Sequence, residues 1–332
     1  ATTGSSQVAI GFEALKAQHT NAHNTAVGTQ AGIAITTGAS NDLFGFQAGD
    51  SITTGGTNIC VGGFSMDGGA AQTGSANTHV GHDGMKVCTS GANNVSMGLS
   101  TMAALTTGHS NTFVGTSAGS ASTTGSENCY IGRSAGRHET TMTVGNRNNV
   151  MGAYSAPSAV NGNDQIVLGN DVKGTANATM TVGVSDNTAS LALDGSDTSW
   201  AAASSDERLK ENIETSKLGL NFINDLRPVN YNWKKGKDVP TDMPQYKEGS
   251  EEPVLGYEYG KSQHGFIAQE CKAVQDKYVD DLADGFRLWI EKDDGTQTVA
   301  DGNLIPVLVK AVQEMSTQVD ELKSELLALK GE

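Results

Sequence analysis

The chain has 332 residues, enough for about two or three ordinary domains, and a formal net charge of −15. This acidic balance argues against nucleic acid as a partner, because binding to phosphates needs a cationic surface. No apolar run approaches the roughly 18 residues that a membrane-spanning helix requires, so we expect no membrane insertion. The four cysteines, Cys60, Cys88, Cys129 and Cys271, show no C-x-x-C spacing and are expected to be reduced thiols.

Composition divides the chain near residue 200. Residues 1–199 hold 31 of the 41 glycines but only 7 of the 18 aromatic residues. Residues 200–332 hold the other 11 aromatics, with 16 Lys or Arg against 25 Asp or Glu. The first part lacks the large side chains of an ordinary core, so another kind of packing must stabilise it. Its first residues already fit the repeat described next, and we expect the sequence to be the C-terminal piece of a longer chain.

A repeat runs through most of the first part. Ten segments share a glycine that follows an apolar residue, and seven of the nine intervals between these glycines are 17 residues. The glycines are Gly11, Gly28, Gly45, Gly62, Gly81, Gly98, Gly115, Gly132, Gly152 and Gly169. Four positions before the glycine stands Asn in eight copies and Gln in the two outer ones. A second glycine, usually in "TTG" or "TG", often follows ten residues after the first.

A fixed short period indicates a solenoid, in which each unit packs only on its neighbours. Seventeen residues at about 3.3 Å each give a contour of roughly 56 Å, which suits one flat coil with two or three short strands. We expect the glycines to supply positive φ at tight corners, and stacked Asn side chains to form a ladder that satisfies corner backbone groups. One inward apolar residue per strand gives a thin core, so we expect several rods to pack side by side and bury a second apolar face.

Segments such as "NTAVGTQAGIAITTGASN" resemble the repeats of phage tail-fibre shafts and, more distantly, the coils of trimeric autotransporter adhesin heads. The resemblance covers most of residues 1–183. It implies a homotrimer of parallel β-rolls, with an upstream tail-fibre shaft and a host-cell surface glycan or protein as partners.

Two repeats are longer than the others, and we expect loops to bulge near residues 63–74 and 133–149. The second loop gathers Arg133, Arg137, His138 and Arg147, in a region with only 6 Lys or Arg. Arginines can hold phosphate or carboxylate groups of a bacterial surface glycan, so these four residues are the candidate receptor contacts. The alternative is charge pairing between neighbouring subunits, or simple solvation of the loops.

The stretch "SSDERLKENI", residues 204–213, stands where the composition changes. Ser204 and Glu207 match the S-x-x-E capping box and good helix formers follow, so a helix start is the simplest interpretation. Ser205 and Lys210 are also the two side chains of a Ser–Lys dyad, in which a desolvated lysine activates a nearby hydroxyl. The dyad requires Ser205 in an extended lead-in, with Lys210 folding back on it.

Three segments and a closing heptad helix resemble, in order, the intramolecular chaperone domain of phage tailspikes, endosialidases and tail fibres. The segments are "SDERLKENIE", "LNFINDLRPVNYNWK" and "HGFIAQE". This family is also the self-cleaving peptidase family S74, and the resemblance implies a domain that trimerises, directs folding of the fibre before it and then cuts itself off.

The resemblance also implies roles for particular residues. Ser205 would be the nucleophile and Lys210 its general base, with a scissile bond flanking Ser205 on the side of Ser204 or of Asp206. His264 is either a residue that orients the reacting group or a structural histidine. Some relatives assist folding without cleaving, so it stays open whether this chain is a single-turnover autoproteolytic serine endopeptidase.

Apolar residues alternate steps of three and four through the end of the chain. They are Ile305, Leu308, Val312, Met315, Val319, Leu322, Leu326 and Leu329. This spacing predicts a coiled-coil helix, the alternative being an ordinary amphipathic helix on a core. β-Branched residues at several a positions with Leu at d favour a dimer, so the trimer is implied by the resemblance alone.

The expected fold is a mainly β N-terminal part, a trimeric parallel β-solenoid (β-roll) of 17-residue coils, followed by an α+β chaperone domain that ends in a coiled-coil helix. The expected boundaries are 1–183 for the repeats, 184–203 for a linker, 204–300 for the chaperone domain and 301–332 for the helix. The glycines form neither a dinucleotide-binding nor a P-loop motif, and neither a cofactor nor a metal is expected.

The predicted function is a trimeric phage tail-fibre tip that attaches to the host cell. It would be assembled in the host cytoplasm and carried in the virion, with a chaperone that registers the fibre and releases itself. The alternative is a bacterial trimeric adhesin head or an ice-binding β-solenoid without enzymatic activity. A polysaccharide depolymerase would need paired carboxylates in a wide groove, and residues 1–199 offer only 12 scattered Asp or Glu.

Overall fold

The computed structural model describes residues 6–18, 22–137, 143–194, 201–202, 206–254, 260–283 and 285–330. The chain folds as two compact units, residues 1–209 and 210–332. The division falls inside the "SSDERLKENI" stretch that the composition marked as a border.

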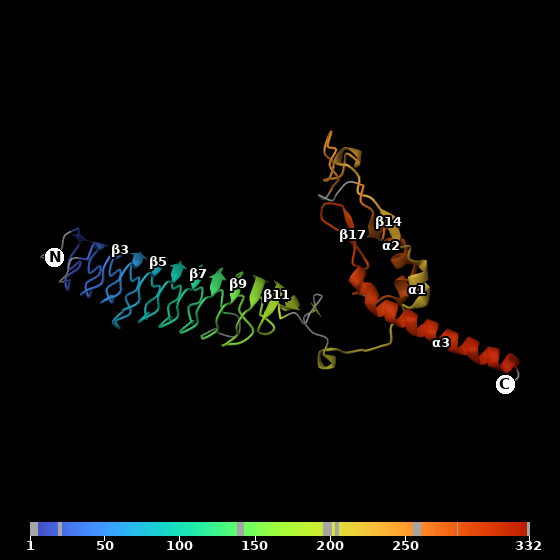
Figure 1. The fold of residues 1–332 in the computed structure, drawn as a ribbon, viewed down its shortest axis with the longest axis horizontal. Helices are drawn as coiled ribbons and strands as arrows, with labels where there is room; N and C mark the ends of the chain where they lie inside the picture. The colour runs from blue at the N-terminus through green and yellow to red at the C-terminus, as the bar shows by residue number, and fades with distance from the viewer. Residues whose placement is uncertain are drawn as a thin grey trace. The chain divides into compact units, whose positions relative to one another are not determined.

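The first unit is a parallel β-solenoid in which each coil contributes one short strand (Figure 1). The strands of the ten coils are β1 (Val8–Ile10), β2 (Thr25–Val27), β3 (Asp42–Phe44), β4 (Ile59–Val61), β5 (Thr78–Val80), β6 (Val95–Met97), β7 (Thr112–Val114), β8 (Cys129–Ile131), β9 (Asn149–Met151) and β10 (Ile166–Asn170). They pair in parallel and in sequence order, each strand with the next. The predicted solenoid is confirmed.

The coils contain fewer strands than predicted. In the described part of the repeat, each coil has one named strand, and isolated bridges such as Ile52 to Gln72 are all that remains of a second extended side. The expectation of two or three strands per coil was therefore wrong. The reason is that turns with positive φ recur within each coil, for instance at Gln30 and Gly32 after β2, and leave only three residues extended.

The repeated glycine makes the corner at the end of each strand. Its φ lies between +125° and +148° in the ten copies, a region that residues with a side chain rarely adopt. A Cβ atom at Gly28 would also lie 2.1 Å from the carbonyl oxygen of Gly45 in the next coil. Both the corner and the close stacking of coils require glycine here, as predicted.

The core of the solenoid combines the middle residues of the strands with buried apolar residues from the turns. From β2 to β9 the middle residue of each strand is buried, and this row includes Leu43, Phe113, Tyr130 and Val150. Phe113 and Tyr130 stack face to face with ring centroids 4.4 Å apart. The inward residue is therefore not the apolar residue just before the glycine, which points to the outside.

The asparagines form the predicted ladder along the core. The backbone N–H and the side-chain Nδ2 of Asn41 both donate to Oδ1 of Asn24, at 2.7 and 3.1 Å, and Nδ2 also donates to the carbonyl of Gly55 at 3.0 Å. The same pattern repeats from Asn58 to Asn148. These side chains are almost completely buried, and the ladder pairs groups whose burial alone would be costly.

Antiparallel strands close the C-terminal end of the solenoid. β11 (Thr179–Val184) pairs in parallel with β10, β12 (Asn187–Ala192) then runs antiparallel to β11, and β13 (Ala201–Ala202) pairs antiparallel with β12. Part of the segment predicted as a linker is thus a strand of the same sheet.

The second unit is a small α+β domain. Its helices are α1 (Leu220–Asp225), α2 (Ala268–Lys277) and α3 (Leu304–Lys330), and its two antiparallel pairs are β14 (Val229–Tyr231) with β15 (Gln263–Gly265) and β16 (Trp289–Glu291) with β17 (Gln297–Val299). Single 3-10 turns are η2 (Gly236–Asp238), η4 (Val279–Asp281) and η5 (Asp301–Asn303). Phe222 is the centre of the core, with the rings of Tyr278 and Phe286 packed edge-on against it. The α+β domain and the long terminal helix agree with the predicted fold.

Helix α3 extends well beyond this core. Leu304, Val307 and Ala311 in its first turns are buried, whereas Leu322 and Leu329 are 63% and 85% exposed. The predicted heptad residues thus form an apolar seam that nothing covers in the single chain. No helix in the described part of the chain is both long and apolar enough to cross a membrane.

Candidate functional site

The border stretch contains one tight turn instead of a helix. The 3-10 turn η1 (Glu207–Leu209) is closed by Asp206, whose Oδ1 accepts a hydrogen bond from the backbone N–H of Arg208 at 2.9 Å. The Arg208 guanidinium also donates to both carboxylate oxygens of Asp206, and this pairing holds the pKa of Asp206 below its usual value. A side chain that bonds nearby backbone groups offers the chain an alternative to a helix, which explains why the turn does not continue.

The predicted dyad is described only in part. Ser204 and Ser205 lie outside the described residues, as does the capping role predicted for Ser204. Lys210, the predicted general base, directly follows η1 and is exposed in the single chain. Asp206, on one side of the predicted scissile bond, is the carboxylate that closes the turn.

An exposed strap follows the dyad, residues 211–217, with no regular secondary structure. It ends at Leu218, which is 5% exposed and belongs to the core of the second unit. Just beyond, the backbone N–H of Leu220 donates to Oε2 of Glu314 in α3 at 2.7 Å. A Cβ atom at Gly219 would lie 2.3 Å from the same oxygen, so glycine lets the carboxylate approach. The strap is therefore firmly anchored at its downstream end.

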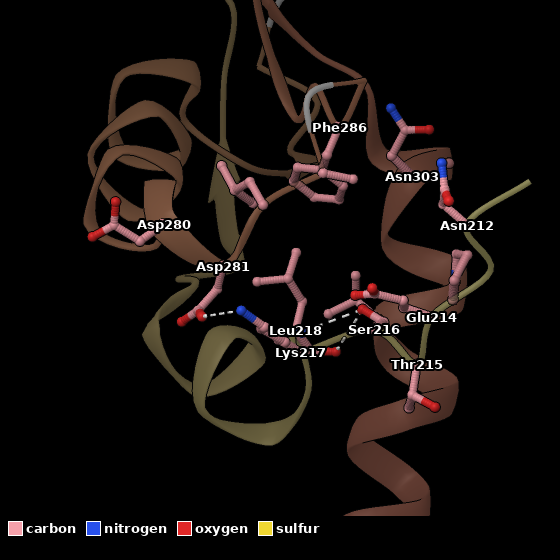
Figure 2. A pocket seen from close by; sticks show the side chains of 15 residues that line it. Asn212, Glu214, Thr215, Ser216, Lys217, Leu218, Asp280, Asp281, Phe286 and Asn303 are labelled. Carbon is pink, nitrogen blue, oxygen red and sulfur yellow. Dashed lines mark hydrogen bonds and ion pairs between the residues drawn. The ribbon is translucent and has the colours of Figure 1, made fainter.

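The strap forms one wall of a cleft of about 560 Å³ in the second unit (Figure 2). The other walls are residues 280–283, Phe286 and the chain at the start of α3, from Gly302 to Val307. Lys217 Nζ lies 3.7 Å from Oδ1 of Asp281 across the cleft, as Figure 2 shows. Apolar side chains and the carboxylates of Glu214, Asp280 and Asp281 line it together.

The cleft shows no catalytic constellation among the residues that the structure describes. The hydroxyl of Ser216 accepts a hydrogen bond from the backbone N–H of Leu218 at 3.2 Å, and Lys217 is paired with Asp281. Within the described ranges, no group of three or more His, Cys, Asp or Glu side chains is placed to hold a metal ion. The cleft lies between the strap and the rest of the second unit, and its described lining residues do not form a second candidate catalytic site.

His264 lies in β15, directly opposite Asn230 of β14, and its side chain is exposed. The structure therefore places it on the outside of a two-stranded sheet. Its part in orienting a reacting group stays a prediction.

The predicted receptor residues are held by different neighbours. Arg147 Nε and Nη2 donate to the two carboxylate oxygens of Asp164 in the next coil, at 2.6 and 2.9 Å. The guanidinium of Arg133 lies over the ring of Tyr154, 5.1 Å from its centroid. Arg137 is exposed, and His138 lies outside the described residues. A ligand anion at Arg147 would have to compete with the Asp164 carboxylate.

The structure identifies the second apolar face, which the sequence predicted without naming its residues. We call it the outer apolar row, the residue just before each repeated glycine. Its members are Ile10, Val27, Phe44, Val61, Val80, Met97, Val114, Ile131, Met151 and Leu168. Six of them are more than a third exposed, among them Ile10 at 59% and Met97 at 51%. No coil places a charge in this row. The sequence already indicated this face. In a strand, neighbouring side chains point to opposite sides, so a position next to the buried middle residue faces outward, and here it is apolar in every coil.

Residues 205–280 match the model of the peptidase S74 family, described as "Chaperone of endosialidase". The match begins at Ser205 and ends inside η4, so it includes the strap, α1, the β14–β15 pair and α2. No curated protein and no solved structure matches the chain significantly. A chaperone of this family implies a trimeric, fibre-type protein. With the ten-coil solenoid before it, the chain fits a tail-fibre-like protein with a C-terminal chaperone domain.

Proposed function

We propose that this chain is the C-terminal part of a trimeric phage tail fibre whose solenoids are brought into register by the domain that follows them. The observation that carries the proposal is the outer apolar row, which is exposed in the single chain and uninterrupted over ten coils. A contiguous apolar stripe of this extent marks an interaction surface.

A second copy of the chain is the partner that fits this row. The row repeats once per coil, and a neighbour that matches it from end to end must have the same repeat. Covering a half-exposed Val, Met or Phe is worth roughly 1 kcal/mol, so ten coils together supply an amount similar to the whole stability of a small domain.

Such an interface leaves its register undetermined. A slip by one coil still places an apolar residue against an apolar residue, at almost the same energy. The chaperone domain can select one register, because it is not repetitive and ends in the exposed apolar seam of α3. If copies associate first through α3, their solenoids would then pair in the correct register.

Release of the chaperone would follow assembly. The Ser205 hydroxyl attacks a peptide carbonyl flanking it, while the Lys210 amine takes the hydroxyl proton and passes it to the leaving amine. Water then hydrolyses the resulting ester. Lys210 is exposed in the single chain. If other copies cover it in the trimer, cleavage would follow assembly, and the freed fibre would be kinetically trapped once its template has left.

Attachment to the host is assigned to the outer surface of the solenoid. Arg133, Arg137, His138 and Arg147 are the candidate contacts for anionic groups of a surface glycan. Arg147 is already paired, so its part is expected to be the smallest, and adsorption of particles with Arg133→Ala or Arg137→Ala is the measurement that tests the set.

The experiment that tests the chaperone function compares wild type with Ser205→Ala, Lys210→Ala and, as the matched control, Ser204→Ala. Denaturing gels and intact-mass spectrometry are expected to show two fragments for wild type and the control and one uncut chain for the other two variants. Light scattering is expected to report trimers for all four. An uncut wild type contradicts release, and a monomeric uncut chain contradicts the trimer.

A further inference from the structure

Three aromatic side chains stack along the outside of the third to fifth coils. We call Phe46, Phe64 and His82 the aromatic ladder. The ring centroids of Phe46 and Phe64 are 5.1 Å apart and those of Phe64 and His82 are 5.3 Å apart, both edge-on. We infer that this ladder fixes the register in which copies of the solenoid pack, an inference that rests on the proposed trimer.

The two outer members of the ladder, Phe46 and His82, are exposed in the single chain. Phe46 is 47% exposed, and Phe44, two residues earlier in the outer apolar row, is 42% exposed. Phe64 is partly exposed and takes a left-handed backbone conformation with φ at +53°, at a place in the coil where most other copies have polar residues and the ninth has Tyr154. A partly exposed aromatic ring gains from a surface that covers it.

The occupant that fits is a second copy of this chain. Phe44 belongs to the outer apolar row, which repeats with the period of the solenoid itself, and Phe46 follows it directly after the corner at Gly45. The ladder therefore begins beside the row that a partner copy would cover. The matched family implies a trimeric fibre-type protein, which is consistent with this partner.

The ladder distinguishes a slip by one coil because the adjacent coils differ at its position. The residue just after the repeated glycine is Phe46 in the third coil, but Thr29 in the coil before and Gly63 in the coil after; phenylalanine recurs two coils earlier, as Phe12. A slip by one coil leaves the outer apolar row satisfied but sets the aromatic rings against different groups. Two features would then set the register: the chaperone domain during assembly, and the ladder in the assembled fibre.

The register can be read from disulfides between copies. Cys129 lies in β8 on the outward face, two residues before the outer apolar row and partly exposed, whereas Cys60 and Cys88 are buried. Thr112 is its register partner one coil earlier. In a threefold assembly, a face that lines the axis brings the same residue of the copies together, so like-with-like disulfides report the aligned register. A disulfide between positions 129 and 112 of different copies reports a slip of one coil.

The experiment co-expresses two full-length chains with different tags, one with its native Cys129 and the other carrying Thr112→Cys and Cys129→Ser. Purified trimers are oxidised, and the cross-linked peptides are quantified by mass spectrometry. With an intact ladder, like-with-like disulfides are expected to dominate. With Phe46→Ala and Phe64→Ala in both chains, the 129-to-112 product is expected to rise at least fivefold. Leu99→Ala is the matched control, because Leu99 occupies the same position after the glycine and is 49% exposed.

The outcomes separate this inference from the proposed function. A rise with the Phe variants and none with Leu99→Ala supports the ladder. An unchanged product, an equal rise in the control, or slip already present with the intact ladder overturns it, while trimers by light scattering leave the proposed function standing. Trimers without like-with-like disulfides overturn it as well, and a monomeric wild type contradicts the proposed function itself. If the double Ala variant does not fold, Phe46→Leu with Phe64→Leu keeps the apolar volume and is read in the same way.

Discussion

The two units are stabilised in different ways. In the solenoid, neighbouring coils hold each other through stacked glycine corners, the Asn ladder and the buried apolar side chains of each coil. In the second unit, residues far apart in sequence meet in one core, as Phe222 meets Phe286 and Leu220 meets Glu314. Repetition makes the first unit long but poor in long-range information, whereas the second is short and has a single way to fit together. The second unit can therefore specify an alignment throughout its structure, whereas the first can do so only where its repetition is broken, as at the aromatic ladder.

The largest expected effect contrasts two glycines with positive φ, one in each unit. Gly115 has φ +130°, and a Cβ atom there would lie 2.5 Å from the carbonyl oxygen of Gly132. Gly249 has φ +67° with nothing within 4 Å. Gly115→Ala is expected to destabilise the solenoid by more than about 4 kcal/mol, because backbone cannot move aside, and Gly249→Ala by about 1 kcal/mol. Urea unfolding followed by circular dichroism measures both, and equal losses would contradict the stacking described here.

The second effect breaks the Asn ladder in the middle. Asn111 Oδ1 accepts from the backbone N–H and Nδ2 of Asn128, at 3.0 and 3.1 Å, and its own Nδ2 donates to the Gly125 carbonyl at 2.9 Å. Asn111→Ala leaves several buried groups unpaired and is expected to cost about 3 kcal/mol. Thr107→Ala, at an exposed corner, is the control and is expected to change stability by less than about 0.5 kcal/mol. If Asn111→Ala lost no more stability than Thr107→Ala, water would have to enter the coil and replace the hydrogen bonds of the Asn ladder.

The repeat shows how much the sequence alone could predict. The solenoid and the Asn ladder followed from spacing, because a residue that recurs every 17 positions must lie above its copy in the next coil. Arg147 and Asp164 are also 17 apart, so their ion pair was open to the same reasoning. The number of strands per coil could not be predicted in this way, because three extended residues between turns are too few to show a periodicity.

The aromatic ladder and the border were harder to read from the sequence, for physical reasons. Phe46 and Phe64 are 18 apart and not 17, because Phe64 stands one place later in its coil than Phe46 does. Phe64 and His82 are also 18 apart, because this interval of the repeat is 19 residues long and His82 stands one place earlier in its coil. At the border, Ser204 and Glu207 obey the capping rule for a helix, but the side chain of Asp206 closes a shorter turn first. A local rule failed here because a neighbouring side chain competed for the same backbone groups.

The third effect tests the alignment role of the second unit without touching its core. Leu322 and Leu326 are 63% and 52% exposed in α3. Leu322→Asn with Leu326→Asn is expected to leave the fold of the monomer intact but to weaken association of the uncut chain by about 2 kcal/mol per chain, or roughly 30-fold. Sedimentation at several concentrations measures it, with Glu325→Gln as the control. If association did not change, the seam of α3 would not be part of the trimer interface.

The smallest effect concerns a carboxylate that the solenoid half buries. Burial, and to a smaller extent the neighbouring Asp67 carboxylate, raises the pKa of Asp50 to about 6. Because the folded pKa lies above the unfolded value of about 3.9, the folded state favours the protonated acid, and stability falls as the pH rises from about 4 to 6. The cost above pH 6 is about 1 kcal/mol once solvent screening of a half-exposed group is allowed for.

Asp50→Asn keeps the acceptor for the Ser51 hydroxyl, which bonds Asp50 Oδ1 at 3.0 Å, and removes the charge. It is expected to raise stability at pH 7.5 by about 1 kcal/mol and to change it little at pH 4, so the difference between variant and wild type appears only across this interval. The exposed Asp42→Asn serves as the control, and thermal unfolding at a series of pH values is the measurement. A gain of the same size at pH 4 would show that packing and not charge is responsible, and the stacked coils would then hold a carboxylate at no cost.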